Sequence, residues 1–204
     1  MKRLLVLFVL VVASVSAKAE TPMILVFGDS ISAGHGLVHV EQGWVALLQT
    51  RLKDQGYGYQ VINASVSGET TAGGLARLPR ALMLHQPKIV ILELGGNDGL
   101  RALPIAQMRA NLVHMVDLAT AAGAKVLLLG MRMPPNYGPA FTEQFSLCYS
   151  DLARDKKLPF VPFLLNDVAL SPNLMQADGF HPNELAQPKL LANVWPVLAP
   201  LLRH

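Results

Sequence analysis

Hydrophobic positions in this chain follow two patterns that alternate along the sequence. Continuous apolar runs occupy residues 23–27, 89–92 and 126–129, whereas the stretches between them space their apolar residues three or four positions apart. Continuous runs are typical of strands covered on both faces, as in parallel sheets, and the wider spacing is typical of amphipathic helices. The pattern therefore predicts an α/β protein, a three-layer α/β/α sandwich around a central, mostly parallel sheet.

The same pattern gives the order of the elements. We expect five strands, at residues 23–27, 59–64, 88–94, 125–131 and 160–163. We expect helices at residues 43–55, 104–121 and 141–156, a stretch that is helical in part at residues 75–85, and one more helix at the carboxyl end of the chain. No internal repeat or low-complexity stretch interrupts this order, so residues 20–204 are expected to form one domain.

Residues 1–19 have the three parts of a secretory signal peptide. Lys2 and Arg3 precede an apolar run at residues 4–12, and an Ala-Lys-Ala sequence closes the segment at residues 17–19. The apolar run is too short for a comfortable membrane span. We therefore expect cleavage after Ala19 and a periplasmic protein without a stable membrane anchor.

Charge and cysteine content exclude several classes of function. Three of the 17 basic side chains lie in the signal segment, which leaves 14 basic against 14 acidic side chains. Without net charge or a basic run, the electrostatic footprint of nucleic-acid binding is missing, and no nucleic-acid partner is expected. The lone Cys148 has no partner for an internal disulfide and lies in an apolar helical stretch, so we expect it to be packed in the core.

Polar residues follow three of the predicted strands at the point where each strand ends. Ser30 follows the first strand, residues 65–68 the second and residues 95–98 the third. Ligands of parallel α/β domains bind beyond these carboxyl ends, so the three segments are expected to meet in one site. Asp178 and His181, three positions apart near the last helix, supply the carboxylate and imidazole that activate a serine nucleophile.

Each of these residues alone also has a structural interpretation. A serine such as Ser30 after a strand is commonly a helix cap, and Gly68 and Asn97 are residues that turns favour. Asp178 and His181 alone would fit the capped start of a helix or a surface pair. Their combination, in this order and at strand ends, favours a serine hydrolase.

Other chemistries have little support in the sequence. There is no His-Glu-x-x-His motif, no Cys-x-x-Cys pair and no cluster of carboxylates, so no metal is expected. A Gly-x-Gly-x-x-Gly loop is missing after the first strand, and Ser30 does not lie in a Gly-x-Ser-x-Gly elbow. Asp29 and Asp98 are expected to brace the turns beside them. His35 and His39 lie in a loop near the nucleophile, where a surface position is favoured over a role in the site.

The motifs together carry a resemblance that covers essentially the whole chain after the signal segment. The chain contains, in order, Gly28-Asp29-Ser30, Gly68, Gly95-Gly96-Asn97-Asp98 and Asp178-Gly179-Phe180-His181. In these motifs it resembles the SGNH, or GDSL, hydrolase superfamily, and within it the bacterial periplasmic esterases and thioesterases. The resemblance implies a flavodoxin-like fold and a hydrolysis reaction that requires no cofactor.

The resemblance also implies a role for each residue. Ser30 would attack the acyl carbonyl, His181 would take its proton and pass it to the leaving group, and Asp178 would orient the imidazole. The oxyanion would be held by the backbone N–H groups of Ser30 and Gly68 and by the side-chain amide of Asn97. These roles describe a serine esterase and thioesterase that works through an acyl-enzyme.

The loops expected around Ser30 are apolar, which favours an acyl chain in the substrate. We expect substrate contacts from Gly73, Gly74, Leu75, Leu78, Pro134 and Tyr137. The resemblance implies that residues 73–80 form a loop that moves over the acyl chain. The expected substrates are small acyl and aryl esters, acyl thioesters and lysophospholipids, hydrolysed by a monomer.

Two alternatives stay open on the sequence alone. One is a deacetylase of a periplasmic or exported glycan, a chemistry found in the same superfamily. The other is a catalytically silent module that binds glycan or lipid. A strong preference for acetyl esters would indicate the first, and failure to react with a fluorophosphonate would indicate the second.

Overall fold

Five strands form one parallel sheet between residues 21 and 203, the part of the chain that the computed structural model describes. They are β1 (Met23–Gly28), β2 (Gln60–Asn63), β3 (Ile89–Glu93), β4 (Lys125–Leu129) and β5 (Phe160–Val161). Their order is β2-β1-β3-β4-β5, and the pairings between neighbours are parallel. The predicted α/β fold is confirmed, while the expected signal segment at residues 1–19 lies outside the described residues.

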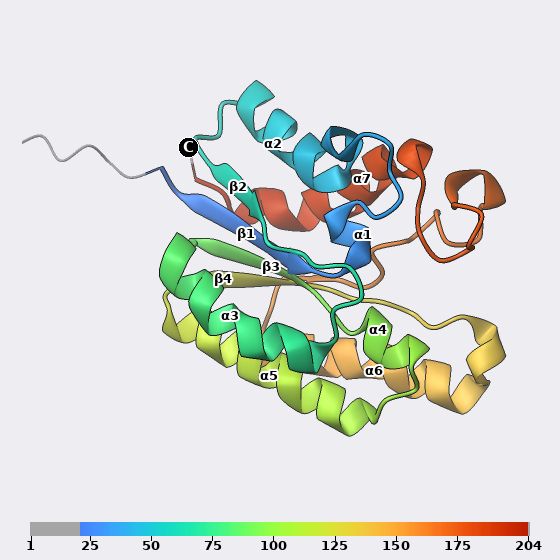
Figure 1. Ribbon diagram of the computed structural model, residues 1–204. Coiled ribbons are helices and arrows are strands. Elements are labelled where there is room, and N and C mark those ends of the chain that lie inside the picture. Colours follow the sequence, from blue (N-terminus) through green and yellow to red (C-terminus); the bar gives the residue numbers. More distant parts are fainter. Residues whose placement is uncertain (1–20, 204) are drawn as a thin grey trace, which may run out of the picture.

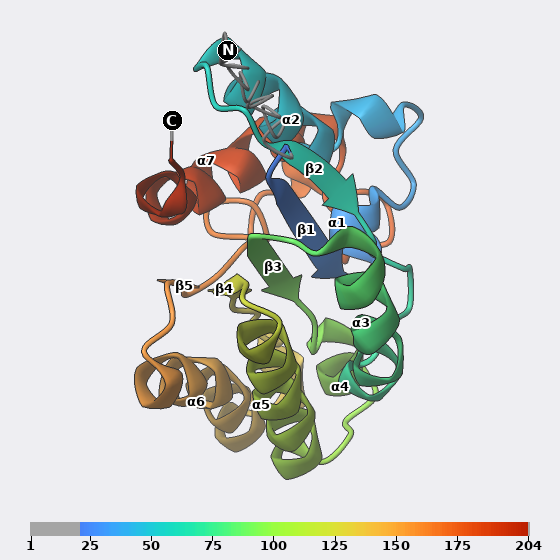
Figure 2. The ribbon, with the colours of Figure 1, turned by 90° about the vertical axis from the view of Figure 1, so that its left-hand side faces the viewer.

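Helices cover both faces of this sheet (Figure 1). The α-helices are α1 (Ser30–Ala33), α2 (Trp44–Asp54), α3 (Thr71–His85), α4 (Gly96–Leu100), α5 (Ile105–Ala121), α6 (Pro139–Lys156) and α7 (Gln187–Leu198). Short 3-10 helices are η1 (Val40–Gln42), η2 (Pro135–Tyr137), η3 (Pro172–Leu174), η4 (Glu184–Ala186) and η5 (Ala199–Leu201). α2 and α7 lie on one face and α3, α5 and α6 on the other, as the second view also shows (Figure 2).

The continuous apolar runs of the sequence form the middle layer of the protein. Ile24, Phe27, Ile91 and Leu128 are fully buried, and Trp44 of α2 is buried with them. Burying one such side chain stabilises the fold by about 1.5–3 kcal/mol. Because helices cover both faces of the central strands, these strands are apolar at successive positions instead of alternating with polar residues.

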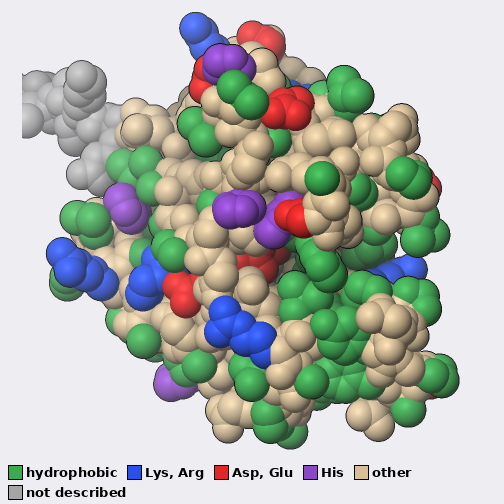
Figure 3. Space-filling view, turned by 45° about the vertical axis from the view of Figure 1, so that its right-hand side comes forward, with side chains coloured by type: hydrophobic (Ala, Val, Ile, Leu, Met, Phe, Trp, Pro, Cys, Tyr) green, Lys and Arg blue, Asp and Glu red, His purple; other side chains and the backbone are tan. Residues whose placement is uncertain are grey.

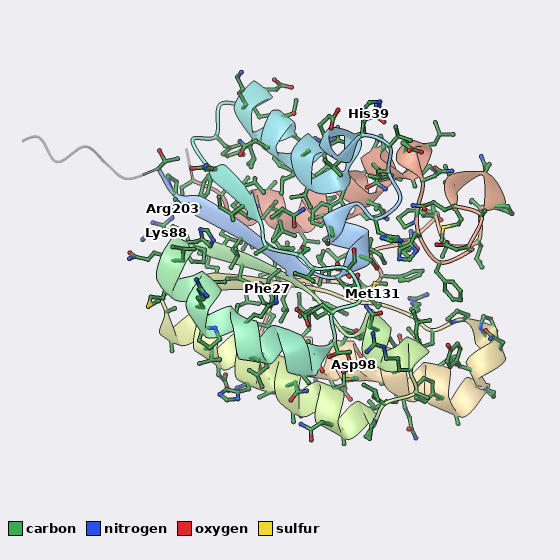
Figure 4. All side chains as sticks on the ribbon, viewed as in Figure 1. Phe27, His39, Lys88, Asp98, Met131 and Arg203 are labelled. Atoms are coloured by element: carbon green, nitrogen blue, oxygen red, sulfur yellow. The ribbon has the colours of Figure 1, made fainter. Side chains whose placement is uncertain are left out.

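The connections that follow β1 and β3 go to opposite faces of the sheet. β1 pairs with β2 on one side and β3 on the other, and α2 and α5, which follow β1 and β3 in the chain, cover different faces. A switch of this kind opens a crevice at the carboxyl ends of the strands, the usual ligand site of an open parallel sheet. In the stick view, Asp98 and Met131 lie toward this end, and Lys88 and Arg203 lie at the opposite end (Figure 4).

Residues 73–80 form part of a helix, as the apolar spacing predicted for residues 75–85, and not the loop that the resemblance implied. They belong to α3, whose N-cap Thr70 accepts the backbone N–H of Gly73 at 3.3 Å. Gly73, Gly74 and Pro79 all have low helix propensity, but one face of α3 is buried against the core. Tertiary packing of that face outweighs the local preference.

Candidate active site

Ser30 begins a helix immediately after the first strand. β1 ends at Gly28, and Asp29 forms the N-cap of α1, with its Oδ1 accepting the N–H of Ile31 at 3.0 Å. The cap holds the chain in a tight turn at the carboxyl end of the sheet. Ser30 is only 9% exposed there, in the position that the motif predicts.

The imidazole of His181 connects Ser30 to Asp178. Its Nε2 lies 2.8 Å from Oγ of Ser30, and its Nδ1 lies 2.7 Å from Oδ2 of Asp178. Oδ1 of Asp178 accepts the backbone N–H groups of Phe180 and His181 at 2.9 and 3.0 Å. The hydrogen bonds from His181 lower the pKa of Asp178 to about 2, so this carboxylate is ionised at neutral pH. An imidazole held in this way can take the proton of a serine hydroxyl.

A hydrogen-bonded loop brings His181 to the nucleophile turn. Gln176 donates through its Nε2 to the carbonyl groups of His35 at 2.7 Å and Pro182 at 3.0 Å. Its backbone N–H donates to the carbonyl of His181 at 2.7 Å. Since the N–H of His35 donates to the carbonyl of Ser30 at 3.0 Å, Gln176 ties the loop to the segment that holds Ser30. The ring centroids of His35 and His181 are 4.6 Å apart, so His35 is a neighbour of the site.

Gly68 lies in the loop after β2. Its φ is +79°, a backbone conformation that favours glycine. The carbonyl of Gly68 accepts a hydrogen bond from Arg101 at 3.1 Å, and the N–H of Val66 donates to the carbonyl of Gly28 at 3.0 Å. The loop is therefore attached to the end of β1, next to the turn that holds Ser30.

Asn97 reaches the site in the first turn of α4. Its Nδ2 donates one hydrogen to Oδ2 of Asp29 at 3.2 Å. The next residue, Asp98, accepts the N–H and the hydroxyl of Thr71 at 2.8 and 2.6 Å, which joins α4 to the start of α3. Asp98 thus braces the turn, as expected, and Asp29 orients the amide of Asn97.

Glu93 is a candidate functional residue that the sequence motifs did not indicate. It ends β3 and is fully buried. Its Oε2 accepts the hydroxyl of Ser32 at 2.6 Å and the backbone N–H of Asp29 at 3.2 Å, two residues that lie on either side of Ser30. The available signal in the sequence is an acidic residue directly after the apolar run 89–92, because acidic residues are rarely buried without a partner.

The buried carboxyl groups of Asp29 and Glu93 hold their protons more tightly than exposed acids do. Burial raises the pKa of Asp29 to about 6, although the hydrogen bond from Ile31 and the charge of His181 act in the opposite direction. Burial and the nearby charge of Asp29 raise the pKa of Glu93 well above its usual value of 4.5. The pair therefore carries one negative charge near neutral pH, mainly on Asp29.

Four of the residues expected to contact substrate belong to α3 instead of a loop. Leu78 is fully buried, and Gly74 lies in the core against Leu94. Gly73 and Leu75 are partly buried in the first turns of the same helix. Gly74 and Leu78 belong to the face of α3 that packs on the core, and the substrate contacts expected of them stay a prediction.

Pro134 and Tyr137 are half-buried, and Tyr137 contacts α4. The hydroxyl of Tyr137 donates to the carbonyl of Leu100, the last residue of α4, at 3.0 Å. Its ring stacks on that of Phe141 with centroids 6.0 Å apart. The space-filling view shows histidine and acidic side chains at one side of a hollow, with hydrophobic side chains gathered beside it (Figure 3). An apolar surface next to the site is suited to an acyl chain.

Other side chains that the sequence singled out have structural or surface positions. Cys148 is buried, and burial raises the pKa of its thiol to about 11, so the thiol is protonated. His39 pairs with Glu41 at the surface, with 3.2 Å between the nearest atoms. Within residues 21–203, no group of three His, Cys, Asp or Glu side chains is placed to hold a metal ion. No helix in the same range has the length and apolar character needed to cross a membrane.

Comparison with known proteins relates this site to a family. A sequence model of the GDSL-like Lipase/Acylhydrolase family matches residues 26–187, which is most of the chain. The chain belongs to this family. The esterase TesA of Pseudomonas aeruginosa is 54% identical to it over 202 residues, covering 99% of this chain and 100% of TesA.

Other family members are similar over nearly their full length. The thioesterase 1/protease 1/lysophospholipase of Escherichia coli is 41% identical over 198 residues, 97% of this chain and 92% of that protein. The crystal structure of TesA has a TM-score of 0.86 at 57% identity, covering 88% of this chain and 99% of that one. The esterase EstA from Pseudoalteromonas sp., inhibited by monoethylphosphonate, has a TM-score of 0.83 at 38% identity, covering 87% and 97%. The chain is therefore a serine ester hydrolase, and the resemblance seen in its motifs is confirmed.

Replacement of Glu93 by glutamine is expected to raise the free energy of unfolding relative to wild type. This difference is expected to grow as the pH rises. The folded wild type keeps the Glu93 proton while the unfolded chain releases it near pH 4.5, so this group lowers wild-type stability as the pH rises above that value. Glutamine has no proton to release, and the variant gains up to about 1.4 kcal/mol per pH unit in this range. Urea unfolding at several pH values measures the difference. A difference that stays constant with pH would contradict the raised pKa of Glu93.

Proposed function

We propose that Ser30 is the nucleophile of an esterase and thioesterase that works through an acyl-enzyme. The observation that carries this proposal is the chain of short contacts from Oγ of Ser30 through His181 to Asp178. Serine is weakly nucleophilic until a base takes its proton, and an ionised carboxylate stabilises the imidazolium that results. Both groups lie where this chemistry needs them.

The proposed reaction has two halves. Oγ of Ser30 bonds to the acyl carbon while its proton moves to Nε2 of His181, and the carbonyl oxygen becomes negatively charged. His181 then gives the proton to the leaving alcohol or thiol as its bond to carbon breaks, which leaves the acyl group on Ser30. In the second half water gives a proton to His181 and bonds to the acyl carbon, and the acid leaves as Ser30 recovers its proton.

The negative oxygen is proposed to bind the N–H groups of Ser30 and Gly68 and the amide of Asn97. The hydrogen bond from Asn97 to Asp29 supports this role, because it fixes the amide and uses only one of its two hydrogens. Donors that are in place before the reaction stabilise the transition state most. Loss of one such donor costs about 10²- to 10³-fold in turnover, roughly 3–4 kcal/mol.

The proposed substrates are acyl and aryl esters, acyl thioesters and lysophospholipids. Relatives of this chain are named esterase, arylesterase and thioesterase/lysophospholipase. The hydrophobic side chains that gather beside the hollow in the space-filling view offer an apolar surface to an acyl chain (Figure 3). Each methylene group buried on such a surface contributes about 0.8 kcal/mol.

The signal segment is proposed to direct export to the periplasm and to be removed after Ala19. The basic pair at Lys2 and Arg3, the apolar run and the Ala-Lys-Ala sequence support this proposal. Amino-terminal sequencing of the protein recovered from a periplasmic extract is expected to begin at Glu20. A first residue of Met1 in that extract would show that the segment is retained.

Ser30→Ala is expected to lower kcat by about 10⁴-fold or more, because the triad acts as a unit. The variant is also expected to lose labelling by a fluorophosphonate probe. Ser150→Ala is the matched control, since the hydroxyl of Ser150 donates only to the Leu147 carbonyl within α6. It should react and turn over like the wild type, and thermal unfolding checks that both variants fold. Full labelling of Ser30→Ala would place the nucleophile elsewhere.

The apolar surface beside the site predicts a preference for longer acyl chains over acetyl. The kcat/KM for p-nitrophenyl octanoate is expected to exceed that for p-nitrophenyl acetate by about tenfold or more, since several methylene groups gain contacts. Initial rates over a series of chain lengths measure the preference. A strong preference for acetate would indicate the deacetylase alternative instead.

A further inference from the structure

Glu93 holds two residues that flank the nucleophile. Its Oε2 accepts the backbone N–H of Asp29 at 3.2 Å and the hydroxyl of Ser32 at 2.6 Å. A single carboxyl oxygen therefore fixes the main chain before Ser30 and a side chain after it. The same oxygen lies so close to the α carbon of Gly28 that a Cβ there would overlap it. The turn and the carboxyl group fit each other without spare room.

Asp29 extends this arrangement to the oxyanion donors. Its Oδ2 accepts an amide hydrogen of Asn97 at 3.2 Å, and its Oδ1 accepts the N–H of Ile31 at 3.0 Å. The peptide group between Asp29 and Ser30 carries the N–H that the proposed function assigns to the oxyanion. Two of the three proposed donors thus depend on the position of Asp29, and that position depends on Glu93.

Several observations indicate that Glu93 is a neutral acid. It is fully buried, and its Oε1 has no hydrogen-bond partner among the described residues. Burying a carboxylate with one oxygen unpaired costs far more than burying the neutral acid. Two other ionisable groups interact with the pair: the charge of His181 acts on Asp29, and Tyr149 of α6 interacts with both Asp29 and Glu93. Burial raises the pKa of Tyr149 well above its usual value, so Tyr149 stays protonated and adds no charge.

We propose that Glu93 is a positioning residue for ester hydrolysis: as a neutral acid it clamps the main chain around Ser30 and thereby aligns the oxyanion donors. Because it is protonated, the one negative charge of the pair stays on Asp29. That charge lies close enough to His181 to favour the imidazolium formed during the reaction. This role rests on the proposed function of Ser30.

Two substitutions separate the hydrogen bonds of Glu93 from its space-filling role in the core. Glutamine reproduces the pattern of a protonated carboxyl group, with an acceptor toward Asp29 and Ser32 and a donor on the other atom. Leucine has a similar volume but no acceptor. Glu93→Gln is expected to keep kcat within about threefold of wild type. Glu93→Leu is expected to lower kcat by about tenfold or more with KM nearly unchanged. Small misplacements of reacting groups cost up to about 10²-fold in rate.

The measured quantity is kcat per active site, with p-nitrophenyl butyrate as substrate and a fluorophosphonate titration to count reactive sites. Leu128→Ala, a fully buried change in β4, is the matched control. It is expected to lower the melting temperature but to keep the wild-type kcat per titrated site. A Glu93→Leu enzyme with wild-type kcat per site would show that Glu93 only supports the core. A Glu93→Gln enzyme as slow as Glu93→Leu would show that the charged carboxylate is needed, and either result overturns the inference.

The pH dependence of the reaction rate is a second test, which a purely structural role of Glu93 would not affect. It can be carried out even if Glu93→Leu fails to fold. Asp29→Asn lacks the charge that stabilises the imidazolium, so its kcat is expected to lie below that of the wild type. As the pH falls and Asp29 gains its proton, the wild type loses the same charge, so the ratio of the wild-type kcat to the Asp29→Asn kcat is expected to narrow on the acid side. A ratio that stays constant with pH would contradict the role given to the Asp29 charge. Failure of the proposed function is distinguishable, because Ser30→Ala would then still be labelled.

Discussion

The parallel pairing of β1 with β3 is the constraint on which the site depends. It places Gly28 in register with Glu93, at the level of the sheet where both strands end. The carboxyl group of Glu93 occupies the space over Gly28, so this position accepts no side chain. A slip of one residue would turn Glu93 to the other face of the sheet and remove both of its hydrogen bonds. Because the nucleophile turn begins at the next residue, strand register decides where Ser30 lies.

Three carboxyl groups near Ser30 have different protonation because their surroundings differ. Asp178 is exposed and accepts hydrogen bonds from the backbone and ring of His181, so its pKa falls to about 2. Asp29 and Glu93 are buried, and desolvation is the main cause that raises the pKa of each. A buried acid pair lowers the stability of the core, and the surrounding apolar strands offset that cost. Residues that oppose stability in this way are expected at functional sites.

The sequence was sufficient to predict the layers and the five strands, and it singled out Ser30, Asp178 and His181, which the structure brings within hydrogen-bond distance of one another. Strand runs and strand-end motifs are local signals, and the spacing of Asp178 and His181 puts both on one turn. Helices α1 and α4, of four and five residues, were not predicted because they are too short to show a period. The spacing of apolar residues predicted a helix in part over residues 75–85, whereas the resemblance implied a loop at residues 73–80. The helix begins earlier, at Thr71, because packing on the core outweighs the low helix propensity of Gly73, Gly74 and Pro79.

The role of Glu93 was harder to predict because its contacts are not local. Its partners Asp29 and Ser32 are 64 and 61 positions away in the chain, and both contacts follow from strand register. Nothing in the spacing of motifs reports register. The one local sign of this role is an acidic residue at the end of an apolar strand. Its contacts can be inferred only when the neighbouring strand and its register are known.

The position of His181 does not depend on strand register, because this residue lies in a loop 151 positions away from Ser30. It belongs to a compact unit of four residues, in which Asp178 accepts two backbone N–H groups and the imidazole of the same turn. Acid and base are therefore aligned with each other before they meet the serine. Only the position of this unit must be set by the rest of the fold, and the bond from Gln176 to the His35 carbonyl sets it against the segment after α1. The proposed oxyanion donors lack such a local unit, which is why their alignment depends on contacts between strands.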